Sequence, residues 1–230
     1  DPGAHELLPS RLAAEALGSA VAAAAELTRR ARASDPALVH HVTGMNFLAP
    51  GGSSVPHPHL QVHVRSLPYS GVSRLLQAGR EAAAREGGNG WEALLAEERG
   101  GPRHLGASGP VEWLAAFAPA HQKEVWGLLP GKSSLVELGE AEARAFGEGI
   151  AKVVANYEEQ GQHAFTLAFL SAPEPDRSHT LQVRLAARPA LRATYVNYDT
   201  WFAPLFAGDD AHTEAPESHA ARLRARWGGR

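Results

Sequence analysis

The spacing of apolar residues along the chain predicts helices that alternate with strands. Residues 9–33, 71–85, 91–99 and 140–160 have helical spacing; the last range carries Phe146, Ile150, Val153, Val154 and Tyr157 on one side. Short apolar runs predict strands over residues 39–48, 57–65, 111–117, 124–129 and 163–170, with a loop over residues 49–56. The Pro-Glu-Ser sequence at residues 216–218 indicates the start of a closing helix.

The order helix, strand, loop, strand occurs twice. Residues 60–68 (Leu-Gln-Val-His-Val-Arg-Ser-Leu-Pro) align without a gap with residues 181–189 (Leu-Gln-Val-Arg-Leu-Ala-Ala-Arg-Pro). Residues 47–50 (Phe-Leu-Ala-Pro) are echoed by residues 169–173 (Phe-Leu-Ser-Ala-Pro). The repeated order of elements favours duplication of one unit. We therefore predict two related halves, residues 1–100 and residues 101–230.

Composition and charge exclude several classes of protein. A chain of 230 residues with 44% hydrophobic and 20% charged residues is globular, not disordered. A net charge of −3 without a run of Lys or Arg argues against a nucleic acid polymer or an anionic membrane as partner. No apolar stretch approaches the roughly 18 residues that a membrane span needs. The lack of cysteine excludes disulfides and thiolate metal sites.

Candidate chemistry is concentrated in residues 51–63, Gly-Gly-Ser-Ser-Val-Pro-His-Pro-His-Leu-Gln-Val-His. If a strand begins at residue 57, its two-residue period places His57, His59, Gln61 and His63 on one face. Imidazoles and a carboxamide beside a glycine-rich loop suit phosphoryl or nucleotidyl transfer. A histidine-rich surface strand and a metal site without covalent chemistry are the alternatives.

The motif resembles the Ser-x-Pro-His-Pro-His-x-Gln active-site motif of the galactose-1-phosphate uridylyltransferase branch of the histidine-triad superfamily. Ser54, Pro56, His57, Pro58, His59 and Gln61 match it. The resemblance implies an α+β fold of two histidine-triad-like halves, with an antiparallel sheet and flanking helices. It also implies a further N-terminal segment in relatives, so we expect the first half to be incomplete.

The resemblance makes His59 the nucleophile that attacks the α-phosphate of a nucleotide and becomes a nucleotidyl-histidine. Gln61 stands where histidine-triad hydrolases carry a third histidine; a neutral amide holds phosphoryl oxygens but shuttles no proton, which favours transfer over hydrolysis. In the repeat, His57 and His59 are replaced by Ser178 and Thr180. We therefore expect one active constellation per chain and a degenerate second half.

The resemblance also suggests binding and metal positions. Asn46, Ser53 and Ser54 correspond to phosphate-contacting residues, with Gly51 and Gly52 permitting close backbone approach. Tyr198 and Asp199 resemble a Tyr-Glu pair that contacts the sugar. His57 and His5 match zinc ligands of some members, but the chain has no cysteine to complete such a site. We therefore expect His57 to position His59 by hydrogen bonding, with no cofactor unless upstream ligands complete a zinc site. The family's second metal site is lost, because its histidines align with Leu170, Val183 and Leu185.

The combined interpretation is a cytoplasmic, homodimeric nucleotidyltransferase. It would pass a nucleoside monophosphate from a nucleotide-sugar or dinucleotide to phosphate or a sugar phosphate. Three alternatives stay open: a nucleotide hydrolase of the same superfamily, a diverged biosynthetic enzyme, and a nucleotide-binding protein without turnover. Base, sugar and acceptor do not follow from the sequence.

Overall fold

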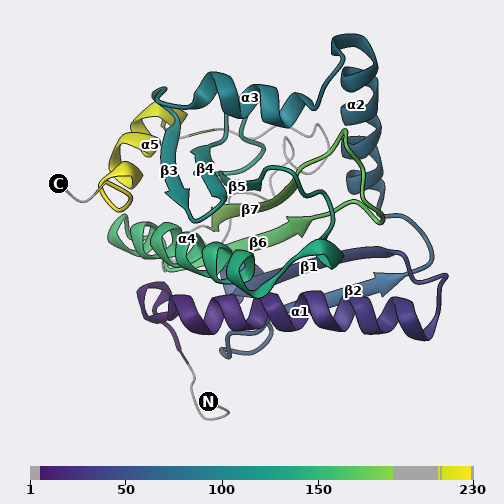
Figure 1. Cartoon of the computed structure of the whole chain (residues 1–230). Coiled ribbons are helices and arrows are strands. Elements are labelled where there is room, and N and C mark those ends of the chain that lie inside the picture. Colours follow the sequence, from purple (N-terminus) through teal and green to yellow (C-terminus); the bar gives the residue numbers. More distant parts are fainter. Residues whose placement is uncertain (1–5, 189–211, 213, 229–230) are drawn as a thin grey trace.

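The computed structural model describes residues 6–188, 212 and 214–228. These residues form five helices and seven strands (Figure 1). The helices are α1 (Ala14–Ser34), α2 (Ser70–Glu86), α3 (Gly90–Glu98), α4 (Glu140–Glu159) and α5 (Pro216–Arg224). The strands are β1 (His40–Phe47), β2 (Gln61–Arg65), β3 (His104–Ser108), β4 (Val111–Ala115), β5 (Val125–Leu129), β6 (Ala164–Leu170) and β7 (Leu181–Arg188).

All seven strands belong to one antiparallel sheet in the order β2-β1-β6-β7-β5-β4-β3. The triplets α1-β1-β2 and α4-β6-β7 have the same order along the chain, and β1 pairs with β6 where the two triplets meet. The expected α+β fold, with an antiparallel sheet and flanking helices, is therefore confirmed. The proposed division at residue 100 falls in the connection between α3 and β3 and stays a prediction.

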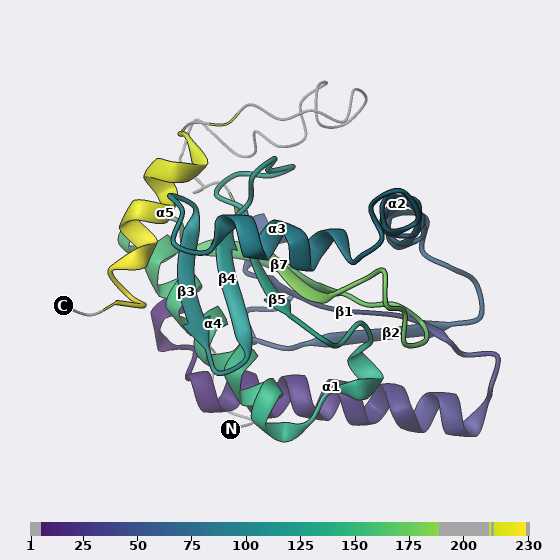
Figure 2. The same cartoon turned by 45° about the horizontal axis from the view of Figure 1, so that its top comes forward.

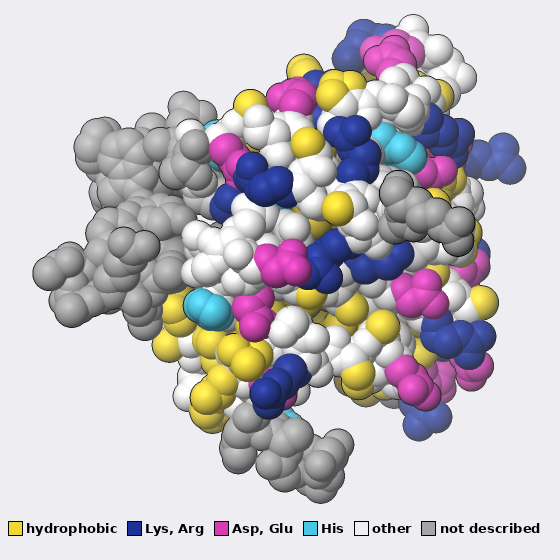
Figure 3. Space-filling model, turned by 90° about the vertical axis from the view of Figure 1, so that its left-hand side faces the viewer, with side chains coloured by type: hydrophobic (Ala, Val, Ile, Leu, Met, Phe, Trp, Pro, Cys, Tyr) yellow, Lys and Arg dark blue, Asp and Glu magenta, His cyan; other side chains and the backbone are white. Residues whose placement is uncertain are grey.

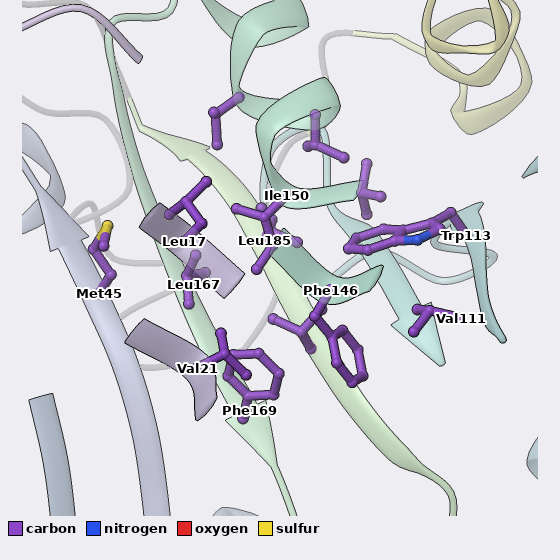
Figure 4. Close-up of a cluster of buried hydrophobic side chains, with 14 of the residues drawn as sticks. Leu17, Val21, Met45, Val111, Trp113, Phe146, Ile150, Leu167, Phe169 and Leu185 are labelled. Carbon is purple, nitrogen blue, oxygen red and sulfur yellow. The ribbon is translucent and has the colours of Figure 1, made fainter. Parts of the chain in front are cut away.

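Helices α1 and α4 pack side by side on one face of the sheet (Figure 1). Gly18 and Gly147 allow this close contact, because a Cβ on Gly147 would lie 2.4 Å from the backbone nitrogen of Gly18. Large side chains from both helices and from the strands fill the space beneath them, among them Phe146, Phe169 and the fully buried Trp113 (Figure 4). Removing this apolar surface from water stabilises the join between the two halves.

Helix α3 covers the opposite face of β4 and β5, whereas α2 stands beside the sheet (Figure 2). The α3 side chains Trp91, Leu94 and Leu95 pack there against a small second core of Leu114, Ala116, Trp126 and Leu128. On this opposite face, β1, β2 and β6 have partly exposed positions. The two ends of the sheet therefore differ in how far helices cover them.

Two sequence-based expectations about strands were wrong. The strand predicted from residue 57 begins only at Gln61, because Pro58 has no N–H for the ladder and no β1 residue beyond Gly44 pairs with β2. The structure also contains β3, which the apolar pattern did not predict. Gly106 interrupts that strand with a φ of 133° and a shift in register.

Neither the described helices nor the side of the molecule in Figure 3 indicates a membrane span or a basic stripe. No helix in the described ranges is long and apolar enough to cross a bilayer. On the side shown in Figure 3, Lys and Arg side chains are interspersed with Asp and Glu side chains. Such mixing on this side does not build the single-sign field that attracts a nucleic acid polymer.

Candidate active site

The loop between β1 and β2 carries the motif and is held in place by the second half of the chain. It turns sharply at Leu48 (φ 61°) and Gly52 (φ 89°). Gly51 lies directly against β6, where a Cβ would come within 2.5 Å of the carbonyl oxygen of Phe165. Thr166 Oγ1 donates to the carbonyl of Gly51 (3.2 Å), and Arg188 Nε donates to the carbonyl of Pro50 (3.2 Å).

Thr166 and Arg188 are contributions that sequence reasoning missed. Arg188 was visible as a member of the repeated segment, but nothing in its sequence context pointed to residue 50. Because both anchors come from β6 and β7, these two strands position the candidate catalytic loop. The conformation of the loop therefore depends on β6 and β7 as well as on β1 and β2.

His59 is oriented by the backbone of its own motif. Its Nδ1 lies 2.7 Å from the carbonyl oxygen of His57. A carbonyl only accepts, so Nδ1 carries the hydrogen and a neutral imidazole keeps its lone pair on Nε2. Both histidines are half-buried in the loop before β2. In this tautomer Nε2, and not Nδ1, carries the lone pair of the His59 ring.

Gln61 opens β2 and lies opposite Gly44 of β1. Directly paired residues of antiparallel strands share a face, so Gln61 is on the same side of the sheet as Asn46 and His63. This is the face that α1 and α4 leave uncovered. Gln61 and His63 are exposed there, whereas Asn46 is half-buried.

A small hollow brings together part of the predicted phosphate site. Asn46, Ser53 and His57 line it together with Glu6, which sequence reasoning did not select. Ser53 Oγ donates to the carbonyl of Val55 (2.6 Å) and so braces the loop. The exposed Ser54 is not among its lining residues.

The described residues do not assemble a metal centre. Within the described ranges, no three His, Cys, Asp or Glu side chains come close enough together to hold a metal ion. Glu6 lies beside His57, so the N-terminal segment reaches the motif, but His5 lies outside the described residues. Val183 and Leu185, at positions of the family's second metal site, are core residues. The residues on view do not fit zinc or iron.

Other candidate residues fall outside the site or outside the described chain. Tyr198 and Asp199 both lie beyond the described residues. His41, the second residue of β1, is buried, and its Nε2 lies 2.8 Å from Ser171 Oγ. Burial lowers the pKa of His41, so it forms a neutral link between β1 and the end of β6.

The start of α3 contacts the β6–β7 loop, which corresponds in the second half to the loop between β1 and β2. Ser178 Oγ donates to Asp176 Oδ1 (2.6 Å), and the Asn89 amide donates to Thr180 Oγ1 (3.0 Å). Asn89 also accepts from the backbone N–H of Trp91 and so caps α3. Gln182, the counterpart of Gln61, is fully buried. The residues that replace the motif therefore serve packing.

Comparisons with known proteins agree with this architecture. No protein-family model matches the chain. An uncharacterized protein of Archaeoglobus fulgidus is 29% identical over 189 residues, which cover 82% of this chain and 57% of that protein. The chain thus spans somewhat more than half the length of this curated relative.

Solved structures show the same fold at low sequence identity. A uridylyltransferase superposes with a TM-score of 0.83 and 20% identity, covering 95% of this chain and 69% of the other. An ADP-glucose phosphorylase from Arabidopsis thaliana with bound ADP-glucose gives a TM-score of 0.78 and 15% identity, covering 96% and 70%. At the level of the fold, these similarities confirm the resemblance that the motif indicated: this is an α+β protein with the fold of uridylyltransferase-like structures.

Proposed function

We propose that the protein is a nucleotidyltransferase that works through a covalent nucleotidyl-histidine at His59. The observation that carries the proposal is the hydrogen bond from His59 Nδ1 to the His57 carbonyl, which leaves the lone pair of the neutral ring on Nε2. The shared fold with a uridylyltransferase and an ADP-glucose phosphorylase supports the same class of reaction.

The proposed reaction has two displacements at the same phosphorus atom. Nε2 of His59 forms a bond to the α-phosphorus of a nucleotide-sugar or dinucleotide, and the bond from that phosphorus to the bridging oxygen breaks. The leaving group departs as a sugar phosphate from a nucleotide-sugar, or as a nucleotide from a dinucleotide. An incoming phosphate oxygen then attacks the α-phosphorus and releases the neutral imidazole. Dividing one difficult displacement into two is the advantage of a covalent intermediate.

The neighbouring residues have supporting roles in this proposal. Gln61 holds the phosphoryl oxygens on the open face of the sheet, and Asn46, Ser53 and Ser54 bind phosphate with the backbone of the glycine loop. Neither a metal nor another cofactor takes part. Tyr198 and Asp199 contact the sugar. The enzyme works as a homodimer in the cytoplasm.

Intact-mass spectrometry tests the proposal directly. The protein is incubated separately with UDP-glucose, ADP-glucose and diadenosine tetraphosphate, without acceptor. One donor is expected to add a single nucleoside monophosphate that is labile to acid and stable to base, as phosphoramidates are. Adding phosphate or a sugar phosphate should then discharge the adduct into a new nucleotide. Turnover of a donor without any adduct, under quench conditions that preserve phosphoramidates, contradicts the mechanism.

A further inference from the structure

A large cavity lies between residues 80–92 of the first half and residues 131–179 of the second, apart from the His-Pro-His loop. It measures about 930 Å³ and is bounded by the end of α2 with the α2–α3 connection, the turn after β5, and the β6–β7 loop. Its lining residues fall between residues 80 and 92, 131 and 137, and 175 and 179, so none belongs to the loop before β2. A volume of this size accommodates a small organic molecule.

The cavity has a defined wall because α2 packs closely on the β6–β7 loop. Gly79 makes this contact, since a Cβ there would lie 2.8 Å from the carbonyl oxygen of Ser178. On the other side, Asn89 donates to the carbonyl of His179 (3.1 Å) and fixes the start of α3. Helix α2 is seen beside the connection between β6 and β7 in Figure 2.

Among the described residues, three cationic side chains line the cavity, Arg80, Lys132 and Arg177. Lys132 is held by Glu142 and by the carbonyl of Glu137. Arg177 is exposed and has no hydrogen bond or ion pair within the described chain. Arg80 uses Nε and Nη2 to hold Asp176 Oδ2, each at 2.8 Å, which leaves Nη1 for another partner. Guanidinium groups are the preferred protein partners of phosphate oxygens.

Acceptors for hydroxyl groups lie in the same cavity. One oxygen of Glu92 accepts from the N–H of Gly131, and one oxygen of Glu137 accepts from the N–H groups of Ser133 and Ser134. Neither of their second oxygens has a hydrogen bond among the described residues. These carboxylates therefore retain acceptor capacity for a ligand.

No Phe, Tyr or Trp side chain is among the described residues that line the cavity, whereas charged side chains are. We propose that this cavity is a second ligand site, distinct from the candidate catalytic loop, that binds a phosphorylated sugar. Arg80 and Arg177 bind the phosphate, and Glu92 and Glu137 accept from the sugar hydroxyls. The proposal does not depend on turnover at His59.

Titration with glucose 1-phosphate, followed by backbone amide chemical shifts, tests this site. Saturable shifts are expected in residues 87–89, 131–133 and 175–179. Replacing both arginines (Arg80→Ala with Arg177→Ala) should lower the affinity for glucose 1-phosphate, obtained from these shifts, by at least about tenfold. Each lost guanidinium removes charge-assisted hydrogen bonds. The charge-matched control replaces Arg74 and Arg85, exposed residues of α2 that do not line the cavity, and should leave the affinity unchanged.

Glucose and inorganic phosphate serve as separate probes. Glucose should give no saturable shifts in these loops, and phosphate should give weaker ones than glucose 1-phosphate. Shifts confined to residues 48–61, equal shifts with glucose, or an unchanged affinity in the Arg80/Arg177 variant each overturn the proposal. Because residues 48–61 report separately, failure of this site is distinguishable from failure of the proposed catalytic function.

Discussion

The carbonyl oxygen of His57 accepts a hydrogen bond of 2.7 Å from Nδ1 of His59. The first histidine of the motif thus orients the second through its backbone carbonyl. Pro58, between them, limits the backbone conformations that the pair can adopt. This relationship separates the expected effects of replacing the two histidines.

Replacing His59 should abolish the nucleotidyl adduct, whereas replacing His57 should not. His59→Ala removes the nucleophile, and transfer should fall on the order of a thousandfold or more. His57→Ala keeps the carbonyl that orients His59, so transfer should fall by no more than about a hundredfold. Intact mass and initial rates measure both effects. An adduct that persists in His59→Ala shows that the nucleophile is another residue.

Gln61 should control the balance between transfer and hydrolysis. A histidine at this position could donate a proton to a leaving group, whereas the amide cannot. Gln61→His is therefore expected to raise the ratio of hydrolysis to transfer, measured as free nucleoside monophosphate against transfer product. Gln61→Asn, which retains an amide, is the matched control and should lower both rates with the ratio unchanged. A constant ratio in Gln61→His, with the adduct still forming, removes the assigned role.

Metal should be dispensable for adduct formation. The chain has no cysteine, and the described residues bring no three metal-ligating side chains together. Elemental analysis of protein purified without added metal should give well below one zinc or iron per chain. Dialysis against a chelator should leave the adduct yield unchanged. A stoichiometric metal that survives such dialysis contradicts this expectation, and its loss in His57→Ala would identify that residue as a ligand.

Stability should fall below neutral pH because of His219. This residue packs against the ring of Tyr157 and lies near Lys123 and Glu214. Burial and the Lys123 charge lower its pKa from 6.5 to about 3. The unfolded chain therefore binds the proton first, and the free energy of unfolding should fall by about 2 kcal/mol between about pH 8 and pH 5.

Denaturant titrations across that range, with wild type and His219→Gln, measure this contribution. The variant should be less stable at pH 8, because it loses the packing against Tyr157, but its stability should change less with pH. His121→Gln, at an exposed histidine, is the control and should keep the wild-type slope. Equal slopes in wild type and His219→Gln would show that other groups, such as the buried His41 and His179, cause the acid sensitivity.

Adding one methyl group at Gly149 should destabilise the protein. A Cβ there would lie 2.0 Å from the ring of Trp113, which is fully buried and has no room to move. Alanine in place of glycine usually stabilises a helix by about 1 kcal/mol, but the cost of the steric overlap with Trp113 is larger. The free energy of unfolding should therefore fall by roughly 1–3 kcal/mol. Gly88→Ala is the control, because a Cβ there meets nothing within 4 Å. Thermal unfolding of both variants measures the difference.

Several features followed from the sequence because they depend on local periodicity and composition. The long helices are close to the predicted ranges, as with α4 at Glu140–Glu159 against 140–160. The repeated segments predicted two related units, and the resemblance carried by the motif implied the α+β fold. The motif at residues 54–61 is visible in the sequence without any folding. Its chemistry stays a prediction, which follows from the residue types that can attack phosphorus.

Tertiary structure decided the features that join distant residues. Gly51 packs against β6, and Arg188 donates a hydrogen bond to the carbonyl of Pro50. Both contacts join positions more than a hundred residues apart, and no local sequence pattern encodes them. The same holds for the hydrogen bond from Asn89 to Thr180 at the end of the β6–β7 loop, and for the cavity between α2 and that loop. The late start of β2 depended on which strand pairs with β1. Apolar spacing determines which surfaces are buried, but packing and pairing across the sheet determine which residues then meet.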